Sequence, residues 1–132
     1  MITVEQYFGP KPHSEEQAAA AGELLSRVNA LLAEYRLAVG KDNPINPKTG
    51  AMISGSGNGG FRLPDCPEGA AKSSHKEAKA CDIYDPLGEI DAWVTRAVLI
   101  KYNLYREHPN STPTWCHLTT RAPASGCRTF LP

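Results

Sequence analysis

The chain has 132 residues, enough for one domain with a buried core and too few for two ordinary domains. Its 14 Lys and Arg residues balance 14 Asp and Glu residues, and this zero net charge argues against nucleic-acid binding by counterion release and against a polybasic membrane-surface protein. A hydrophobic content of 41% excludes a wholly disordered chain, and 11 glycines with 11 prolines predict long loops between few regular elements.

A long helix is predicted after an extended N-terminal arm. Residues 1–13 are expected to be extended because Pro10 and Pro12 oppose a helix. Ser14 lies three residues before Gln17, the spacing of a capping box, and an apolar stripe at spacings of one, three and four continues the helix to Gly40. The stripe consists of Leu24, Leu25, Val28, Leu31, Leu32 and Tyr35.

The middle of the chain is expected to hold two short strands separated by a long loop. The strands are predicted at Ala51–Ser54 and Cys81–Tyr84. Between them, residues 54–74 are rich in glycine and serine. A loop of this length in so small a domain is usually functional or disordered, and we interpret it as the rim of a substrate cleft.

A second helix is predicted after the second strand. Asp85 is expected to cap it, with Pro86 at its first position, and the helix is expected to end near Tyr102. Its apolar face comprises Ile90, Trp93, Val94, Ala97 and Val98.

The C-terminal part of the chain is expected to be largely irregular. Residues 106–114 are predicted to form a loop, Trp115–Thr119 a third strand, and the tail from Ala122 no regular element. The predicted fold is therefore α+β, a single domain over residues 1–132 with two main helices packed on a small antiparallel sheet.

Two segments carry residue types that bind metals. His75 and Asp82 lie seven residues apart in SSHKEAKACD, and His117 lies in TWCHL on the third predicted strand. On a straight helix seven residues span about 10.5 Å, too far for two ligands of one zinc ion, so the chain must turn between them. Two histidines and one carboxylate leave a fourth position for water, which is the pattern of catalytic zinc. The alternative for each residue is an ordinary polar or solvated role.

These segments resemble the motifs of the M15 family of zinc peptidases, SxHxxGxAxD followed by WxH. The family includes D-alanyl-D-alanine carboxypeptidases and dipeptidases and phage-encoded peptidoglycan peptidases. The resemblance runs from the first predicted helix to Leu118, and the ending TPTWCHLTTRAPASGCRTFLP is similar to that of the small phage and prophage branch. It implies the M15, or hedgehog-like, zinc peptidase fold.

The resemblance also implies roles for individual residues. His75, Asp82 and His117 match the zinc ligands, and Ser73 matches a serine that orders the metal loop by hydrogen bonding and lies by the substrate. Arg62, in the segment GFR, resembles the arginine of the family's SGxR element. There it would hold a substrate carboxylate or polarise the scissile carbonyl, and the alternative is a solvated loop arginine.

Trp115 and two cysteines flank the expected ligands. Trp115 lies two residues before His117 and therefore shares its face of the strand, where it either walls the cleft and contacts substrate or packs in the core. Cys81 and Cys116 are each adjacent to a ligand and are expected to point to the opposite face, into the core.

The sequence departs from the family pattern at two positions. The glycine four residues before the aspartate is Ala78 here, a mild change if its backbone keeps a negative φ. The acidic general base that many members carry three residues before the second histidine is Thr114 here, which cannot act as a base. Glu107 and His108 are the nearest upstream candidates for a catalytic base, and the alternative for each is an ordinary loop residue.

The predicted function is a zinc-dependent peptidase that cleaves peptidoglycan stem peptides, as a D-Ala-D-Ala carboxypeptidase-like enzyme or a phage endolysin, with zinc-activated water as the nucleophile. The alternative is a non-catalytic zinc-binding module of the same fold that binds cell walls or serves as a phage structural part, and Thr114 favours it. A third hypothesis is a disulfide-stabilised secreted domain with a coincidental motif.

The expected location follows from the cysteines and the N-terminus. The four cysteines form no CxxC pair, and the N-terminus MITVEQYFGPKPH lacks the plan of a signal peptide. We therefore expect synthesis in a reducing host cytoplasm, with action on the cell wall after release or as part of a virion. A cytoplasmic dipeptidase fits equally well. The expected partner is a peptidoglycan peptide, with no nucleic acid and no membrane, and the expected state is a monomer.

Overall fold

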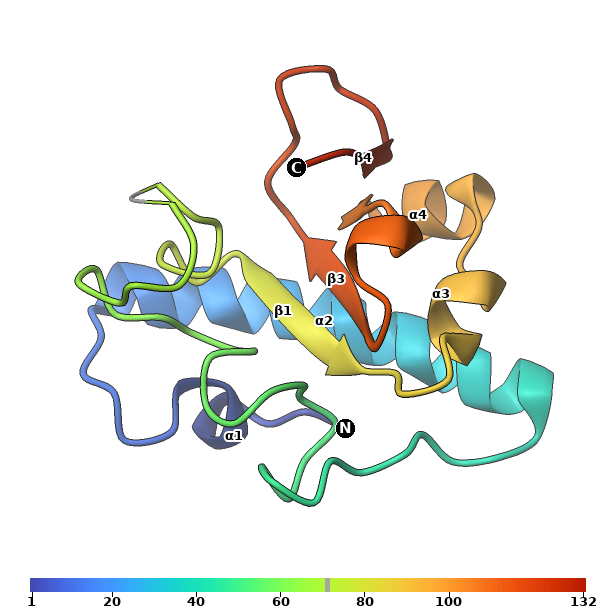
Figure 1. The fold of residues 1–132 in the computed structure, drawn as a ribbon, viewed down its shortest axis with the longest axis horizontal. Coiled ribbons are helices and arrows are strands. Elements are labelled where there is room, and N and C mark those ends of the chain that lie inside the picture. Colours follow the sequence, from blue (N-terminus) through green and yellow to red (C-terminus); the bar gives the residue numbers. More distant parts are fainter. Residues whose placement is uncertain (71) are drawn as a thin grey trace.

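The computed structural model describes residues 1–70 and 72–132. The chain contains both helices and the strands of one small sheet, which confirms the α+β class (Figure 1). The elements are α1 (Val4–Phe8), α2 (Glu15–Val39), β1 (Ala80–Tyr84), α3 (Glu89–Trp93), α4 (Arg96–Tyr102), β2 (Tyr105–Glu107), the 3₁₀ turn η1 (Pro109–Ser111), β3 (Trp115–Thr119) and β4 (Thr129–Phe130).

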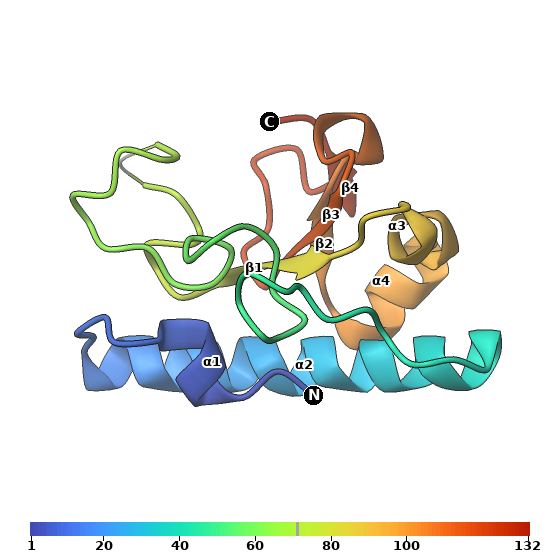
Figure 2. The same cartoon turned by 60° about the horizontal axis from the view of Figure 1, so that its bottom comes forward.

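Helix α2 forms as the sequence predicts. The Ser14 side chain accepts a hydrogen bond from the Gln17 amide, the Gln17 side chain accepts one from the Ser14 amide, and Gly40 ends the helix with a φ of 72°. The predicted apolar stripe is buried throughout. Figure 2 shows α2 running along one side of the molecule beneath the sheet, where its stripe forms most of the core.

The sheet has the strand order β1-β3-β2-β4. Strand β3 pairs antiparallel with β1 and with β2, but β2 pairs parallel with β4, so the prediction of a purely antiparallel sheet is wrong at this edge. Side chains alternate along β1 and β3. Cys81, Ile83, Cys116 and Leu118 are fully buried in the core, which leaves the opposite face of both strands for the functional site.

The N-terminal arm contains a helix that the prediction missed. Helix α1 begins with a second capping box, in which Thr3 and Gln6 exchange the same two hydrogen bonds as Ser14 and Gln17. Gly9 ends α1, and Pro10 and Pro12 lie beyond it, so the two prolines do not prevent this helix.

The second predicted helix is broken in two. Val94 has an extended backbone, and Thr95 starts α4 by accepting a hydrogen bond from the Val98 amide. Helix α3 begins only at Glu89, with Gly88 at its N-cap, so the prediction of Asp85 as the N-cap and Pro86 at the first position is wrong. The Asp85 carboxylate still accepts hydrogen bonds from the amides of residues 90 and 91.

Three smaller predictions also need correction. The strand expected at Ala51–Ser54 is reduced to isolated bridges, one of which pairs Ile53 with Ile83 beside β1. The segment 106–114 contains part of β2 and the turn η1, and the tail contains β4. Strands β2 and β4 are three and two residues long, and they pair with each other across more than 20 residues of chain, as Ile53 does with Ile83.

Candidate metal centre

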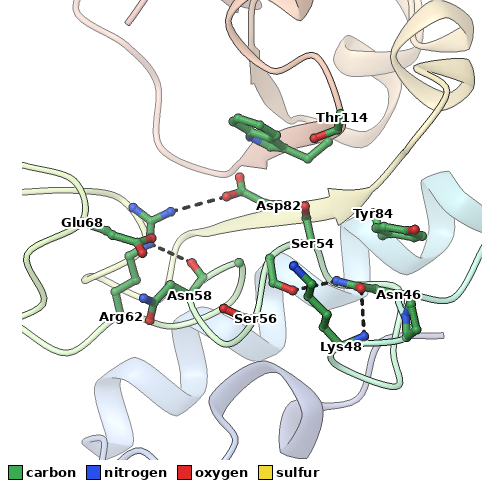
Figure 3. Close-up of a pocket in the computed structure, with 14 residues that line it drawn as sticks. Asn46, Lys48, Ser54, Ser56, Asn58, Arg62, Glu68, Asp82, Tyr84 and Thr114 are labelled. Atoms are coloured by element: carbon green, nitrogen blue, oxygen red, sulfur yellow. Dashed lines mark hydrogen bonds and ion pairs between the residues drawn. The ribbon is translucent and has the colours of Figure 1, made fainter.

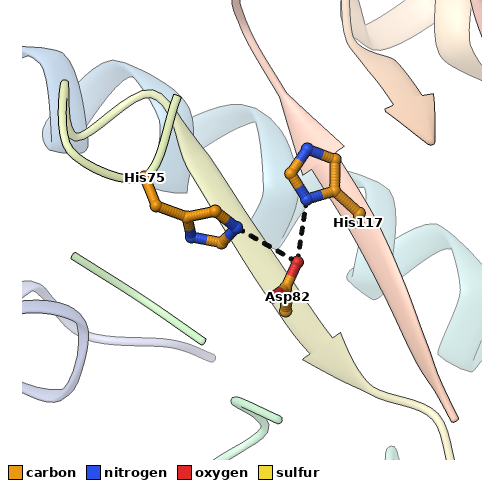
Figure 4. Close-up of side chains that lie close together, drawn as sticks. All are labelled: His75, Asp82 and His117. Carbon is orange, nitrogen blue, oxygen red and sulfur yellow. Dashed lines mark hydrogen bonds and ion pairs between the residues drawn. The ribbon is translucent and has the colours of Figure 1, made fainter. Parts of the chain in front are cut away.

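His75, Asp82 and His117 converge on one point (Figure 4). One ligand atom from each lies within 4.8 Å of the other two, and all three residues are buried. Asp82 Oδ1 lies 2.8 Å from His117 Nδ1 and 3.3 Å from His75 Nε2. Tetrahedral zinc ligands with bonds of 2.0–2.2 Å lie roughly 3.4 Å apart, so these separations suit a group that closes around a small cation.

Strand register brings two of the three together. Asp82 of β1 lies directly opposite His117 of β3, and side chains at opposed positions of an antiparallel pair are in contact. Because their neighbours in both strands point into the core, both side chains must emerge on the same outer face.

His75 reaches the site from a compact turn before β1. The amides of Lys76, Glu77 and Ala78 donate hydrogen bonds to the carbonyls of Ser73, Ser74 and His75, so consecutive hydrogen-bonded turns form over this segment. Ala78 ends the turn with a φ of 59°, so the condition under which alanine would be a mild change from glycine, a negative φ, is not met. A glycine would adopt this conformation without strain, which explains why a glycine suits this place in the motif.

A backbone carbonyl fixes the orientation of His75. Its Nδ1 lies 2.8 Å from the Gly60 carbonyl oxygen, which can only accept, so Nδ1 carries the proton. Nε2 is the ring nitrogen that faces Asp82, and it is the atom that His75 would offer to a cation. The Gly60 segment is held in turn by the Phe61 amide, which donates to the Tyr7 carbonyl.

The site holds a charged carboxylate in a buried place. Burial on its own would raise the pKa of Asp82, but His75 and His117 beside it outweigh burial and hold that pKa below its usual range. The donor set of two imidazoles and one carboxylate matches open catalytic zinc sites, which use three protein ligands. The residues present therefore fit a divalent cation with one position left for another ligand.

Arg62 lies at the edge of this group. Its Nη2 is 3.4 Å from Asp82 Oδ2, and its Nε donates to the Asn58 carbonyl at 2.7 Å. The side chain is mostly buried, so the alternative of a solvated loop arginine does not describe it. Ser73 Oγ accepts a hydrogen bond from the His75 amide at 3.3 Å, as expected of a residue that orders the metal loop.

Of the two candidate bases, the structure brings only Glu107 to the site. Its Oε2 lies 4.0 Å from His117 Nδ1, and it lines the same pocket as the three ligands. His108 instead accepts a hydrogen bond from the Asn110 amide through its Nδ1 and caps η1. Thr114 lies at a different side of the site, where its carbonyl accepts from the Asp85 amide.

Strand register places Glu107 next to His117, as it does Asp82 on the other side of β3. Strand β2 pairs with β3 so that Tyr105 opposes Thr119 and Arg106 opposes Leu118. Continuing this register by one residue places Glu107 beside His117. The segment YRE carries too few residues for its pairing to be evident in the sequence, so only the folded sheet distinguishes Glu107 from His108.

Two pockets meet at the candidate metal centre, and Arg62, Asp82 and Trp115 line both. The first, which we call the Lys48 pocket, extends over the glycine-rich loop, and residues of that loop form its rim (Figure 3). Its other polar lining residues are Asn46, Lys48, Ser54, Ser56, Asn58, Glu68, Tyr84 and Thr114. The second, which we call the C-terminal pocket, extends from the candidate metal centre toward the C-terminal residues. Its lining includes His75, Glu107, His117, Pro123, Phe130 and Leu131.

The cysteines take no part in the group of ligands. All four are free thiols, and Cys81 and Cys116 lie in the core as expected, where burial raises the pKa of both. Among the described residues, no helix is long and apolar enough to cross a membrane.

In comparisons with known proteins, no family model, no curated protein and no solved structure matches the chain. The geometry of the site and the motifs are therefore the basis for inferring its function.

Proposed function

We propose that the chain is a zinc peptidase of the M15 kind that hydrolyses peptide bonds in peptidoglycan stem peptides. The observation that carries the proposal is the buried group of His75, Asp82 and His117, with the carboxylate of Glu107 beside it. Three ligands and an adjacent unliganded carboxylate are the parts that metal-assisted hydrolysis requires. The substrate class rests on the resemblance of the two motifs.

In this proposal each protein group has one task. Zinc, when bound, supplies Lewis acidity, which lowers the pKa of water and polarises the scissile carbonyl. Glu107 accepts a proton from the attacking water and delivers it to the amine that leaves when the C–N bond breaks. Arg62 lines both pockets and orients the substrate through its carbonyl or carboxylate oxygens. Trp115 forms part of the wall between the pockets.

Metal analysis and product analysis test the proposal together. Purified protein is expected to carry about one zinc ion per chain, and His75→Ala to carry little, whereas His13→Ala keeps the metal because His13 stacks on Phe8 away from the site. Digestion of purified peptidoglycan is expected to release new amino termini. Metal-loaded protein that releases none would support the non-catalytic cell-wall or phage structural module instead, and protein without affinity for zinc would contradict both functions.

A further inference from the structure

Two successive peptide units of the glycine-rich loop join His75 to the N-terminal arm. The first lies between Gly60 and Phe61. Its carbonyl accepts a hydrogen bond from His75 Nδ1 at 2.8 Å, and its amide donates one to the Tyr7 carbonyl oxygen at 3.1 Å. Because a peptide unit is planar, the contact with Tyr7 limits the directions in which the carbonyl can point. The ring of His75 is therefore oriented by α1 through one rigid unit.

The second peptide unit, between Phe61 and Arg62, holds the backbone of His75. Its amide donates to the His75 carbonyl oxygen at 3.2 Å, and its carbonyl accepts from Lys11 Nζ at 2.6 Å. The first unit is held by a backbone carbonyl, which every residue type provides, whereas the second is held by a side chain. The chemical identity of Lys11 therefore matters to this contact.

Lys11 also binds the part of the loop that precedes these two units. Its ammonium group donates to the Gly57 carbonyl oxygen and to Asn58 Oδ1, the latter at 3.4 Å. Together with the preceding contact, these engage all three hydrogens of the ammonium group. The Asn58 carbonyl in turn accepts from Arg62 Nε at 2.7 Å, so the same loop segment orients the arginine beside Asp82 (Figure 3).

The oxygen atoms of the loop are the partners of the Lys11 charge. The side chain is half-buried, and this burial lowers the pKa of its ammonium group below the usual value. Among residues 1–70 and 72–132, no carboxylate forms an ion pair with Lys11. Hydrogen bonds from a charged donor are stronger than those between neutral groups, so the loop is held firmly at this point.

We infer that Lys11 is a positioning residue of the candidate metal centre, which fixes the glycine-rich loop so that His75 presents Nε2 to a cation and Arg62 lies beside Asp82. This inference rests on the proposed function, because the centre must bind zinc, and it adds a residue of the N-terminal arm to the parts that the centre needs. In the described part of the chain Lys11 lines neither pocket, so its substitution acts through the loop.

Zinc titration of purified variants tests this role. Lys11→Met keeps the length of the side chain and removes its donors, and it is expected to bind zinc about 10-fold more weakly than the wild type, as for other residues that support a metal ligand. Lys11→Arg, whose guanidinium group can donate to several oxygen atoms, should regain most of the affinity. Lys41→Met changes an exposed lysine that pairs with Glu89 and should bind zinc as the wild type does.

The outcomes of this titration separate the inference from the proposed function. Equal zinc affinity in Lys11→Met and the wild type, or equal losses in Lys11→Met and Lys11→Arg, would overturn the role of Lys11 and leave the proposed function intact. A wild type without affinity for zinc would overturn the proposed function and the inference with it.

The Nδ1 proton of His75 gives a readout that a loss of stability alone would not change. In zinc-loaded protein with ¹⁵N-labelled histidine, this proton donates to the Gly60 carbonyl and is expected to give a resolved downfield resonance. Lys11→Met should broaden or abolish the resonance through faster exchange with solvent, because the carbonyl that accepts the proton is less firmly held. Val28→Ala, which leaves a cavity in the core and lowers the free energy of unfolding, should keep it. A sharp resonance in Lys11→Met, or its loss in Val28→Ala as well, would overturn the inference.

Discussion

Glu107 and His108 are neighbours in the chain and differ completely in their surroundings. Glu107 faces His117 from the adjacent strand, whereas the His108 ring is engaged with the backbone of η1. The position of a side chain relative to the sheet therefore decides which of two chemically suitable residues lies at the candidate metal centre.

Substitution of the two residues separates their roles. Glu107→Gln removes the base but keeps the shape, and peptidase activity is expected to fall by about 10²- to 10⁴-fold while zinc stoichiometry stays unchanged. His108→Ala should retain activity near that of the wild type. Equal loss of activity in the two variants, or loss of zinc in Glu107→Gln, would contradict the assignment of Glu107 as the base.

The raised pKa of Asp91 leads us to expect that the stability of the fold depends on pH. It is 4% exposed, and burial raises its pKa more than Cys116, Arg106 and Thr112 lower it. A folded-state pKa above the unfolded value favours the folded state below about pH 3.9, and this contribution disappears as the pH rises through the raised value. Asp91→Asn has no such titration, so its stability relative to the wild type should increase between pH 3.9 and neutral pH.

Urea unfolding at several pH values measures this difference. Asp42→Asn changes an exposed aspartate and serves as the control, for which the difference from the wild type should stay constant. A difference for Asp91→Asn that is constant or decreases with pH would show that the partners of Asp91 outweigh its burial.

At the scale of elements, the glycine-rich loop supports the candidate metal centre. Gly59 and Gly60 leave no room for a side chain, because a Cβ on Gly60 would lie 2.4 Å from the Tyr7 carbonyl oxygen and one on Gly59 would lie 2.2 Å from the Ser54 carbonyl oxygen. Close backbone approach lets the loop lie against α1 and β1 and present the Gly60 carbonyl to His75.

Gly60→Ala is therefore expected to lower the free energy of unfolding by about 1–3 kcal/mol and zinc affinity by about 10- to 100-fold, since it displaces the carbonyl that orients a ligand. Gly22→Ala is the matched control. Gly22 lies exposed in α2 with open space around it, and alanine there should raise stability by about 1 kcal/mol without affecting zinc. Unchanged zinc affinity in Gly60→Ala would contradict the role of the loop.

At the scale of the whole molecule, the candidate metal centre connects segments that are far apart in the sequence. It joins the turn before β1, strand β1 and strand β3, on the face of the sheet opposite α2. A ligand that binds only the folded state stabilises it in proportion to the logarithm of its concentration.

Zinc at about 100 times its Kd should add about 2.7 kcal/mol to the free energy of unfolding, and EDTA should remove this gain. For a chain of this size the change corresponds to a shift in Tm of roughly 5–15 °C, measurable by scanning calorimetry. His117→Ala should unfold at the same temperature with zinc as with EDTA. An equal Tm for the wild type in both conditions would contradict a metal centre in the folded protein.

Features that depend on near neighbours in the chain are predictable from the amino-acid sequence alone. Helix α2, from its capping box to its terminal glycine, and strands β1 and β3, from their alternation, could be predicted because their signals lie within a few residues. The two motifs also predict that His75, Asp82 and His117 form one group, and the structure brings the three together.

The tertiary structure decided everything that depends on pairing between distant segments. The register between β1, β3 and β2 places Asp82 and Glu107 beside His117, and the contact between the glycine-rich loop and the turn before β1 orients His75. The break at Val94, the bridges of residues 51–53 and strand β4 are likewise too short to be specified locally. Short segments gain their structure from the partners against which they pack, and those partners are present only in the folded molecule.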